Sequence, residues 1–249
     1  MVDGDMTQVR TRNSDLGTRT LSAVVMLAVA GGALWLGGWF WIGLVAVLAV
    51  LVAREWKELV GKFAASRTAL YAWLLAGVAY ISLAAGTLIF LRGGDYSQVL
   101  LTLLAMVIGT DIGAYFFGRL IGGPKIAPRI SPSKTWAGLF GGMFGAALLG
   151  LLMWSLFVYR TAHPFHDMPL PSDFWEVFRY YALRFVIAGI VLAFIAQTGD
   201  FFESWMKRQA GVKDSSALIP GHGGVFDRAD GLLAVAAVVG IYLLVSAFV

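Results

Sequence analysis

The sequence contains no cysteine and only three histidines among its 249 residues. Disulfide bonds, thiolate metal ligands and cysteine nucleophiles are therefore excluded, and carboxylate, imidazole or hydroxyl chemistry remains. Charged residues are also scarce, because Asp, Glu, Lys and Arg together make up 14% of the chain, whereas 59% of it is hydrophobic. This composition is far more apolar than that of an average soluble domain.

The hydrophobic residues form several runs close to the length at which a helix crosses a bilayer, which is roughly 20 residues. We therefore expect an all-α, multi-pass integral membrane bundle. Seven spans fit best, and two re-entrant or split helices, which would raise the number to nine, would not change the loop assignment. The expected spans are residues 21–35, 39–53, 69–91, 99–117, 136–159, 185–198 and 232–249.

The first apolar run follows Arg10, Arg12 and Arg19 and continues with little interruption to Ala53. It shows no convincing cleavage site, so we interpret it as a retained anchor and not as a signal peptide. The short turn at residues 36–38 is flanked by tryptophans, which favour a membrane interface. This pattern predicts a helical hairpin between the first two spans.

Lys and Arg are divided unevenly between the loops. Fifteen of the 19 lie in residues 1–20, 54–67, 119–134 and 207–228, which fall on one side of a seven-span path. Because cytoplasmic loops carry an excess of Lys and Arg, the N-terminus is expected in the cytoplasm and the C-terminus outside. The same bias explains the net charge of +4, so no nucleic-acid partner is expected. Residues 160–178 are interpreted as a solvated loop on the opposite side.

The chain is expected to have three parts. They are a cytoplasmic N-terminal segment (1–20), N-terminal transmembrane helices (21–98) and a catalytic transmembrane domain (99–249) with cytoplasmic loops 119–135 and 199–230. Carboxylates inside or beside a span are costly in lipid and are functional candidates by default. In the third part Asp111, Asp200 and Asp227 meet this description. Together they suit Mg²⁺, which prefers oxygen ligands and usually arrives with substrate phosphates; pairing with Lys or Arg for folding alone is the alternative.

The segment before the last span is rich in residue types that bind phosphate. Its glycines at 221, 223 and 224 allow backbone N–H groups to approach an anion, and its basic residues are Lys207, Arg208, Lys213 and Arg228. His222 is a candidate hydrogen-bond donor to a phosphate, a candidate proton shuttle or a cap of the turn. In a second loop on the same side, Lys134 and Thr135 are placed to reach an anion, although positive-inside topology alone would also explain that loop.

The order of residues in 204–230 resembles the signature of the phosphatidate cytidylyltransferase family, also called CDP-diacylglycerol synthases. The shared pattern is a Ser-x-apolar-Lys-Arg opening, a Lys-Asp pair, a Pro-x-His-Gly-Gly turn and a closing Asp-Arg-x-Asp. Residues 111–119 and 131–136 are also similar to the family's pattern, so the likeness spans about residues 105–235. Ala229 departs from it, since the family more often has a larger apolar residue or Thr there.

The resemblance implies transfer of CMP from CTP to phosphatidate, which releases pyrophosphate and leaves CDP-diacylglycerol in the membrane. It implies Mg²⁺ bound by Asp200 and Asp227, and allows K⁺ beside it. The catalytic candidates are Asp200, Asp227, Lys207, Arg208 and His222. The candidates for substrate binding are Asp111, Lys134, Thr135, Ser204, Lys213, Asp214, Gly223, Gly224 and Arg228.

Two other functions remain open at this point. A CTP-dependent polyprenol or phytol kinase would pass the γ-phosphate to an alcohol and would need a base. A membrane transporter would more typically show paired repeats or broken helices at the midplane. For a phosphatidate cytidylyltransferase of this size we expect a bacterial inner membrane with the active site facing the cytoplasm. The sequence leaves a homodimer open and does not give an acyl-chain preference.

Overall fold

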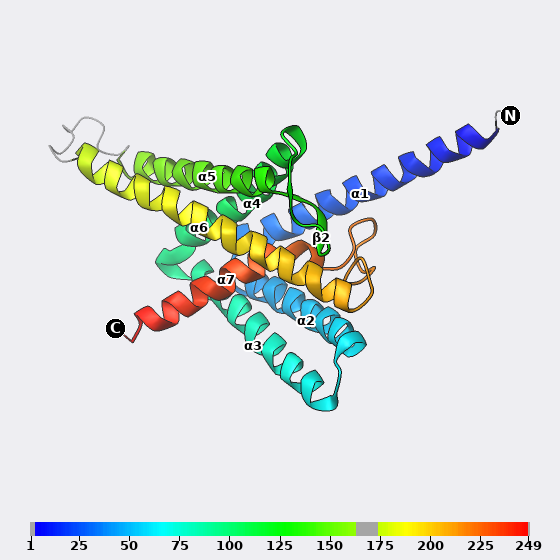
Figure 1. Ribbon diagram of the computed structural model, residues 1–249. Coiled ribbons are helices and arrows are strands. Elements are labelled where there is room, and N and C mark those ends of the chain that lie inside the picture. Colours follow the sequence, from blue (N-terminus) through cyan, green and yellow to red (C-terminus); the bar gives the residue numbers. More distant parts are fainter. Residues whose placement is uncertain (1–2, 163–173, 249) are drawn as a thin grey trace.

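The computed structural model describes residues 3–162 and 174–248 (Figure 1). In these ranges seven helices are long and apolar enough to cross a membrane. The prediction of an all-α, multi-pass membrane protein with seven spans is confirmed. The loop predicted at 160–178 lies mostly outside the described residues, because it includes 163–173.

The first four helices follow one another with short connections, whereas longer segments precede α5 and α7. They are α1 (Asp3–Leu36), α2 (Gly38–Phe63), α3 (Arg67–Arg92), α4 (Ser97–Leu120), α5 (Trp136–Ala162), α6 (Phe174–Gln209) and α7 (Phe226–Ser246). A 3-10 turn, η1 (Gly94–Tyr96), precedes α4. An antiparallel hairpin of β1 (Lys125–Ala127) and β2 (Ser131–Thr135) joins α4 to α5, where the sequence analysis expected only a loop.

The turn between α1 and α2 is as tight as expected. Gly37 and Gly38 have φ angles of 64° and 48°, a left-handed conformation that glycine adopts without a steric penalty. Arg92 braces this turn from α3, because its Nε donates to the carbonyl of Leu34 at 2.9 Å. The two helices diverge from the turn, and α1 projects away from the rest of the bundle (Figure 1). The predicted hairpin is therefore an open one.

Aromatic side chains join four of the helices in the main core. Trp56 of α2 is 3% exposed, and its ring lies 5.8 Å from the rings of Phe202 on α6 and Phe226 on α7. Its Nε1 donates to the carbonyl of Trp73 on α3 at 2.9 Å. Burial of this large ring with its one polar atom satisfied fixes α2, α3, α6 and α7 relative to one another.

The contact between α4 and α5 depends on glycine instead of large side chains. Gly109 and Gly113 of α4 face Gly145 and Gly141 of α5, and a Cβ on any of them would overlap the opposite backbone. Such close approach is typical of membrane helices with small residues four positions apart, because the backbones themselves form the contact. The α4 and α5 backbones therefore form one rigid unit.

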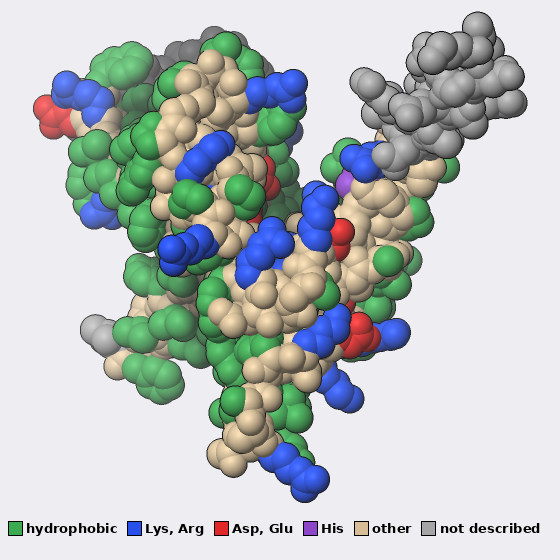
Figure 2. All heavy atoms as spheres, turned by 45° about the vertical axis from the view of Figure 1, so that its right-hand side comes forward, with side chains coloured by type: hydrophobic (Ala, Val, Ile, Leu, Met, Phe, Trp, Pro, Cys, Tyr) green, Lys and Arg blue, Asp and Glu red, His purple; other side chains and the backbone are tan. Residues whose placement is uncertain are grey.

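The loops that carry the candidate site residues lie at the same end of the bundle. In Figure 1 this is the right-hand end, where the β-hairpin, the loop before α7 and the N-terminus lie, whereas the C-terminus lies at the left. In Figure 2 this end is turned toward the viewer, and Lys and Arg side chains are spread over it with a few acidic side chains between them. The basic loops predicted to share one side thus lie at one end of the bundle, and the side of the membrane that they face stays a prediction.

The glycine contact between α4 and α5 leads to a test of stability. Gly113→Ala should lower the free energy of unfolding by about 1–3 kcal/mol, because its methyl group would collide with the carbonyl of Gly141. Titration of the purified protein with SDS in mixed micelles, followed by tryptophan fluorescence, measures the change. Gly43→Ala on α2 is the control, since no atom lies within 4 Å of its Cβ position. Equal stability of the two variants would contradict the packing argument.

Candidate active site

A polar pocket of about 480 Å³ opens between α4, β2, α5 and α6 at the loop-bearing end of the bundle. Four of the predicted site residues line it, namely Asp111, Lys134, Thr135 and Asp200. Further polar lining residues are Tyr115, Arg119, Ser133 and Gln197. The pocket therefore combines both signs of charge with uncharged hydrogen-bonding groups, which suits a ligand that carries phosphates.

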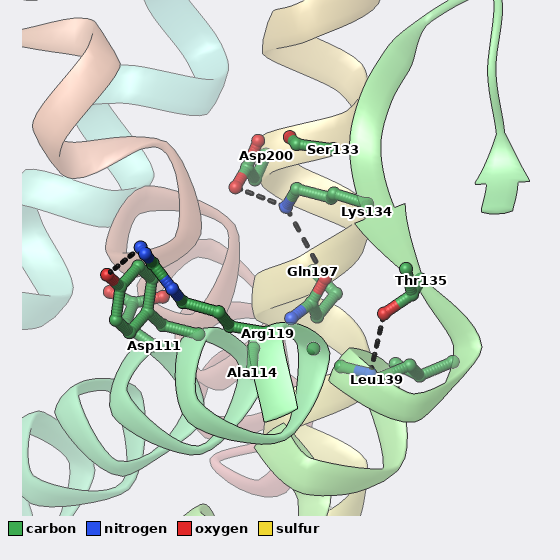
Figure 3. A pocket seen from close by; sticks show the side chains of 12 residues that line it. Asp111, Ala114, Arg119, Ser133, Lys134, Thr135, Leu139, Gln197 and Asp200 are labelled. Carbon is green, nitrogen blue, oxygen red and sulfur yellow. Dashed lines mark hydrogen bonds and ion pairs between the residues drawn. The ribbon is translucent and has the colours of Figure 1, made fainter. Parts of the chain in front are cut away.

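Lys134 is the central charge of this pocket. It extends from the end of β2 toward α6, where its Nζ forms an ion pair with Asp200 and donates to Gln197 Oε1 at 3.4 Å (Figure 3). The Lys134 and Asp200 side chains are 17% and 35% exposed, so the pair borders the pocket and is not sealed off from it. One turn further along α6, Ser204 Oγ donates to Asp200 at 3.4 Å.

The β-hairpin holds Lys134 in place. Thr135, the next residue, accepts a hydrogen bond at Oγ1 from the backbone N–H of Gly138 at 3.0 Å and so caps the first turn of α5. At the tip of the hairpin, the carbonyl of Ile130 accepts from Arg208 Nε at 3.2 Å. Arg208 is thus attached to the hairpin, and its side chain remains exposed at the surface.

A second charged centre lies where the end of α6 meets the start of α7. Lys207 Nζ is 2.6 Å from Asp227 Oδ1 and 2.5 Å from Glu203 Oε2. The other oxygen of Asp227 accepts from Ser215 N, Ser215 Oγ and Gly224 N at 2.8–2.9 Å. The carboxylate of Asp227 is therefore almost fully occupied by donors of the chain itself.

The glycine-rich turn is held in place by a side chain that binds one of its carbonyl groups. Gly221 and Gly223 have positive φ angles of 76° and 83°, which favour glycine. Arg228 donates from Nε and Nη2 to the carbonyl of His222 at 3.0 and 2.7 Å. His222 Nδ1 is buried and has no hydrogen-bond partner among the described residues, so it is a candidate to meet a ligand group. Because Gly224 N–H binds Asp227, the anion at that glycine is one of the chain's own carboxylates.

One face of α6 joins the two centres. Asp200, Ser204 and Lys207 are spaced by four and three residues, which places them above one another on a helix. Lys213 and Asp214 lie exposed on the loop that follows. The structure therefore gathers the predicted residues into a pocket group and a loop group connected by α6.

Sequence reasoning missed Glu55 on α2, which is only 3% exposed and contacts the loop before α7. Its carboxylate accepts bonds from Ser215 Oγ, Ser216 Oγ, Val225 N and Phe226 N at 2.6–3.0 Å. A signal was present in the sequence, because Glu55 shares its helix face with the buried Val52 and Leu59. A carboxylate on an apolar face needs partners from elsewhere in the fold.

The oxygen atoms of the pocket fit Mg²⁺ if the phosphates of a substrate complete the coordination of the ion. Among the described residues no group of three or more His, Cys, Asp or Glu side chains is placed to hold a metal alone. Mg²⁺ usually needs only one or two carboxylates when substrate phosphates bind with it. Asp200 borders the pocket with Asp111, and Asp230 of α7 lies within electrostatic range of both. Joint metal binding by Asp200 and Asp227 stays a prediction.

Residues 94–246 match the model of the cytidylyltransferase family. The chain belongs to this family. The matched region includes every site residue predicted from the sequence, whereas Glu55 and helices α1 to α3 lie before it. The family resemblance inferred from residues 204–230 is thus confirmed.

Relatives from the cytidylyltransferase family agree with this membership. A phosphatidate cytidylyltransferase of Brucella suis is 40% identical over 201 residues, which are 80% of this chain and 63% of the relative. The phosphatidate cytidylyltransferase of Rickettsia bellii is 32% identical over 240 residues, which are 93% of this chain and 94% of the relative. The chain therefore spans less than two thirds of the Brucella protein and nearly all of the Rickettsia one.

The bonds of Asp227 allow a second test of stability. Asp227→Asn should lower the free energy of unfolding by about 1–3 kcal/mol, because the largely buried ammonium of Lys207 would lose one of its two ionic partners and keep only Glu203. The SDS titration used for Gly113 measures this change. Asp214→Asn is the control, since Asp214 lies exposed on the same loop. If both Asn variants were as stable as the wild type, the structural role of the Asp227 carboxylate would be refuted.

Proposed function

We propose that the protein transfers CMP from CTP to phosphatidate, forming CDP-diacylglycerol and pyrophosphate. The observation that carries the proposal is the pocket of Lys134 and Asp200 beside the basic loop before α7, at one end of a membrane bundle. A water-soluble nucleotide and the head group of a lipid can meet there while the acyl chains stay in the bilayer. The names of the relatives from Brucella and Rickettsia support the same reaction.

The chemistry requires alignment and charge screening more than proton transfer. The phosphate monoester of phosphatidate is largely ionised near neutral pH, so its oxygen can attack without a strong general base. This oxygen forms a bond to the α-phosphorus of CTP, and the bond from that phosphorus to the oxygen bridging to the β-phosphate breaks. Pyrophosphate leaves with the electron pair of the broken bond. Fixed cationic side chains stabilise the charge on both partners.

The two groups of residues have separate tasks in this proposal. Lys134 contacts the phosphate of the lipid, because it lies in the pocket between membrane helices. The triphosphate is bound from the loop side by Lys207, Arg208, Lys213, His222 and Arg228. Asp111 supports the metal or a basic neighbour in the pocket. Thr135, Ser204, Asp214 and Gly223 complete the contacts with substrate, whereas the N–H of Gly224 is bound to Asp227.

Asp200 and Asp227 would hold the Mg²⁺ that the family implies, with K⁺ as a predicted neighbour. When bound, Mg²⁺ would screen the negative charge of the phosphates. Asp200 is the more accessible ligand, because it borders the pocket. Its partner there is the ammonium of Lys134, which a divalent cation can displace from the carboxylate. Asp227 additionally orients the first turn of α7 through Ser215 and Gly224.

The proposed setting is a bacterial inner membrane with the pocket on the cytoplasmic side. Its support is the positive-inside rule, since the loop-bearing end contains most of the Lys and Arg residues. CTP is a cytosolic metabolite, so an active site at this end would meet its substrate directly. A homodimer remains an open prediction.

Pyrophosphate release by the purified protein in detergent tests the proposal directly. With CTP, phosphatidate and Mg²⁺, the wild type should release pyrophosphate, and chelation of Mg²⁺ by EDTA should stop the reaction. Asp200→Asn should lower kcat/KM by at least about 100-fold, because it removes a charge used in the transition state. Glu58→Gln is the control, as Glu58 lies on α2 and pairs with Arg54 at the surface.

Labelled CTP distinguishes the reaction from that of a lipid kinase. Transfer of label from the α-phosphate into the lipid fraction is expected for a cytidylyltransferase, whereas a kinase would transfer label from the γ-phosphate. Appearance of only the γ-label in lipid would replace the proposed function with the kinase alternative. Absence of both, in protein shown to be folded, would favour a transporter.

Lys134 provides a separate test of how the lipid is bound. Lys134→Ala should raise KM for phosphatidate by about tenfold, the effect of losing one charge-assisted hydrogen bond, and should raise KM for CTP less. Lys125→Ala is the control on the same hairpin, because Lys125 is exposed and its Nζ makes a long bond of 3.5 Å to the carbonyl of Ser133. An equal rise of both KM values would argue against a specific contact with the lipid phosphate.

A further inference from the structure

The loop that carries the proposed CTP contacts is attached to the N-terminal helices, which lie outside the matched family region. Glu55 of α2 makes the main attachment. Within the part of the chain that the structure describes, its hydrogen-bond partners all belong to one short stretch, residues 215–226. On the other side of the same loop, Ser22 of α1 donates from Oγ to the carbonyl of Pro220 at 3.1 Å.

Glu55 caps the last membrane helix from a distance of 170 positions in the sequence. The first N–H groups of a helix lack partners within the helix and carry partial positive charge. Val225 is the N-cap residue of α7 and has no oxygen on its side chain that could accept from them. The carboxylate of Glu55 fills this role by accepting from Val225 N at 3.0 Å and from Phe226 N at 2.7 Å.

The contact also explains Gly224, which sequence reasoning assigned to phosphate binding. A Cβ at this position would lie 2.6–2.7 Å from both carboxylate oxygens of Glu55 and would overlap Ser215 Oγ. Any larger residue would therefore push the loop away from α2. Glycine at 224 allows the loop to approach the carboxylate of Glu55.

The helix turn that Glu55 holds is continuous in the chain with residues of the proposed site. Asp227 and Arg228 are the next two residues after Phe226, and Arg228 binds the carbonyl of His222. Ser215, whose hydroxyl lies within hydrogen-bond distance of Glu55, donates its backbone N–H to Asp227. A shift of the first turn of α7 would therefore move Asp227, Arg228 and His222 together.

We propose that Glu55 is a positioning residue that fixes the CTP-binding loop and the start of α7 in the geometry needed for catalysis. Glu55 does not touch the substrate and acts through the backbone of residues 215–226. The N-terminal helices thereby contribute to the site as well as to membrane anchoring. This inference rests on the proposed function for the identity of the bound nucleotide.

Steady-state kinetics of Glu55→Gln, Glu55→Asp and Glu58→Gln test the proposal. In Glu55→Gln one carboxylate oxygen is replaced by an amide NH₂ group, which cannot accept a hydrogen bond. At least one of the N–H and O–H groups that donate to Glu55 therefore loses its acceptor. Its KM for CTP should rise about tenfold, the consequence expected for a lost charged hydrogen bond, while its KM for phosphatidate stays within about twofold of the wild type. Asp keeps both oxygens and should recover most of the affinity for CTP. The matched control, Glu58→Gln, is on the exposed side of the same helix and should behave as wild type.

Hydrogen exchange of the intact protein in detergent gives a second measurement that needs no activity. In Glu55→Gln the amides of Val225 and Phe226 should exchange at least about tenfold faster, because they lose a charged acceptor, whereas amides of α4 should not change. Ser216→Ala removes one of the four donors to Glu55, at 2.6 Å, together with the acceptor of Leu218 N at 3.2 Å, and should give a smaller effect of the same kind at Val225 and Phe226. It also serves as the test variant if Glu55→Gln does not fold.

The outcomes separate this inference from the proposed function. A folded Glu55→Gln protein with wild-type KM for CTP and wild-type exchange at Val225 and Phe226 would overturn the inference. So would a loss of thermal stability with unchanged kinetics, since that is the behaviour of a residue needed only for folding. If the wild type itself released no pyrophosphate, the proposed function would fail, and the exchange measurement alone would decide the role of Glu55.

Discussion

The structure depends on the pairing of charges along the end of α6. This helix continues a membrane span and carries Asp200, Glu203 and Lys207, whose charges need partners inside the protein because lipid offers none. Lys134 from the β-hairpin pairs with Asp200, and Asp227 from α7 pairs with Lys207. These two ion pairs bring the hairpin and the start of α7 to the same helix face, and the candidate site is the space between them.

The remaining packing keeps those partners within reach. Direct contact between the glycines of α4 and α5 sets the wall from which the hairpin emerges, so Lys134 arrives at a defined position. The aromatic cluster around Trp56 holds α2 against α6 and α7, and the same face of α2 presents Glu55 to the loop. A cytidylyltransferase with this fold therefore builds its site on helix ends and anchors its longest described loop by buried carboxylates.

Prediction from the sequence succeeded where a property is local. Seven apolar runs indicated seven spans, and the ordered residues of 204–230 indicated the family. The predicted ends of the sixth span were wrong, since residues 185–198 were expected and helix α6 covers Phe174–Gln209. Hydropathy marks the apolar middle of a helix, whereas polar ends stay helical when other elements satisfy their charges. Residues 125–135 were expected to form only a loop, but they form the β1–β2 hairpin. These strands are short and pair with each other, so they leave little signal in the sequence.

The sequence by itself determined that the chain crosses a membrane, where its basic loops lie and which family it resembles. Hydropathy, charge bias and residue order are all readable along the chain. Only the tertiary structure decided which carboxylates line the pocket, as Asp111 and Asp200 do, and which accept hydrogen bonds from the loop before α7, as Glu55 and Asp227 do. The reason is distance along the chain, because Glu55 and Ser215 are 160 positions apart and Lys134 and Asp200 are 66 apart. Whether a glycine N–H binds a substrate phosphate or an internal carboxylate depends on which anion the fold brings to it.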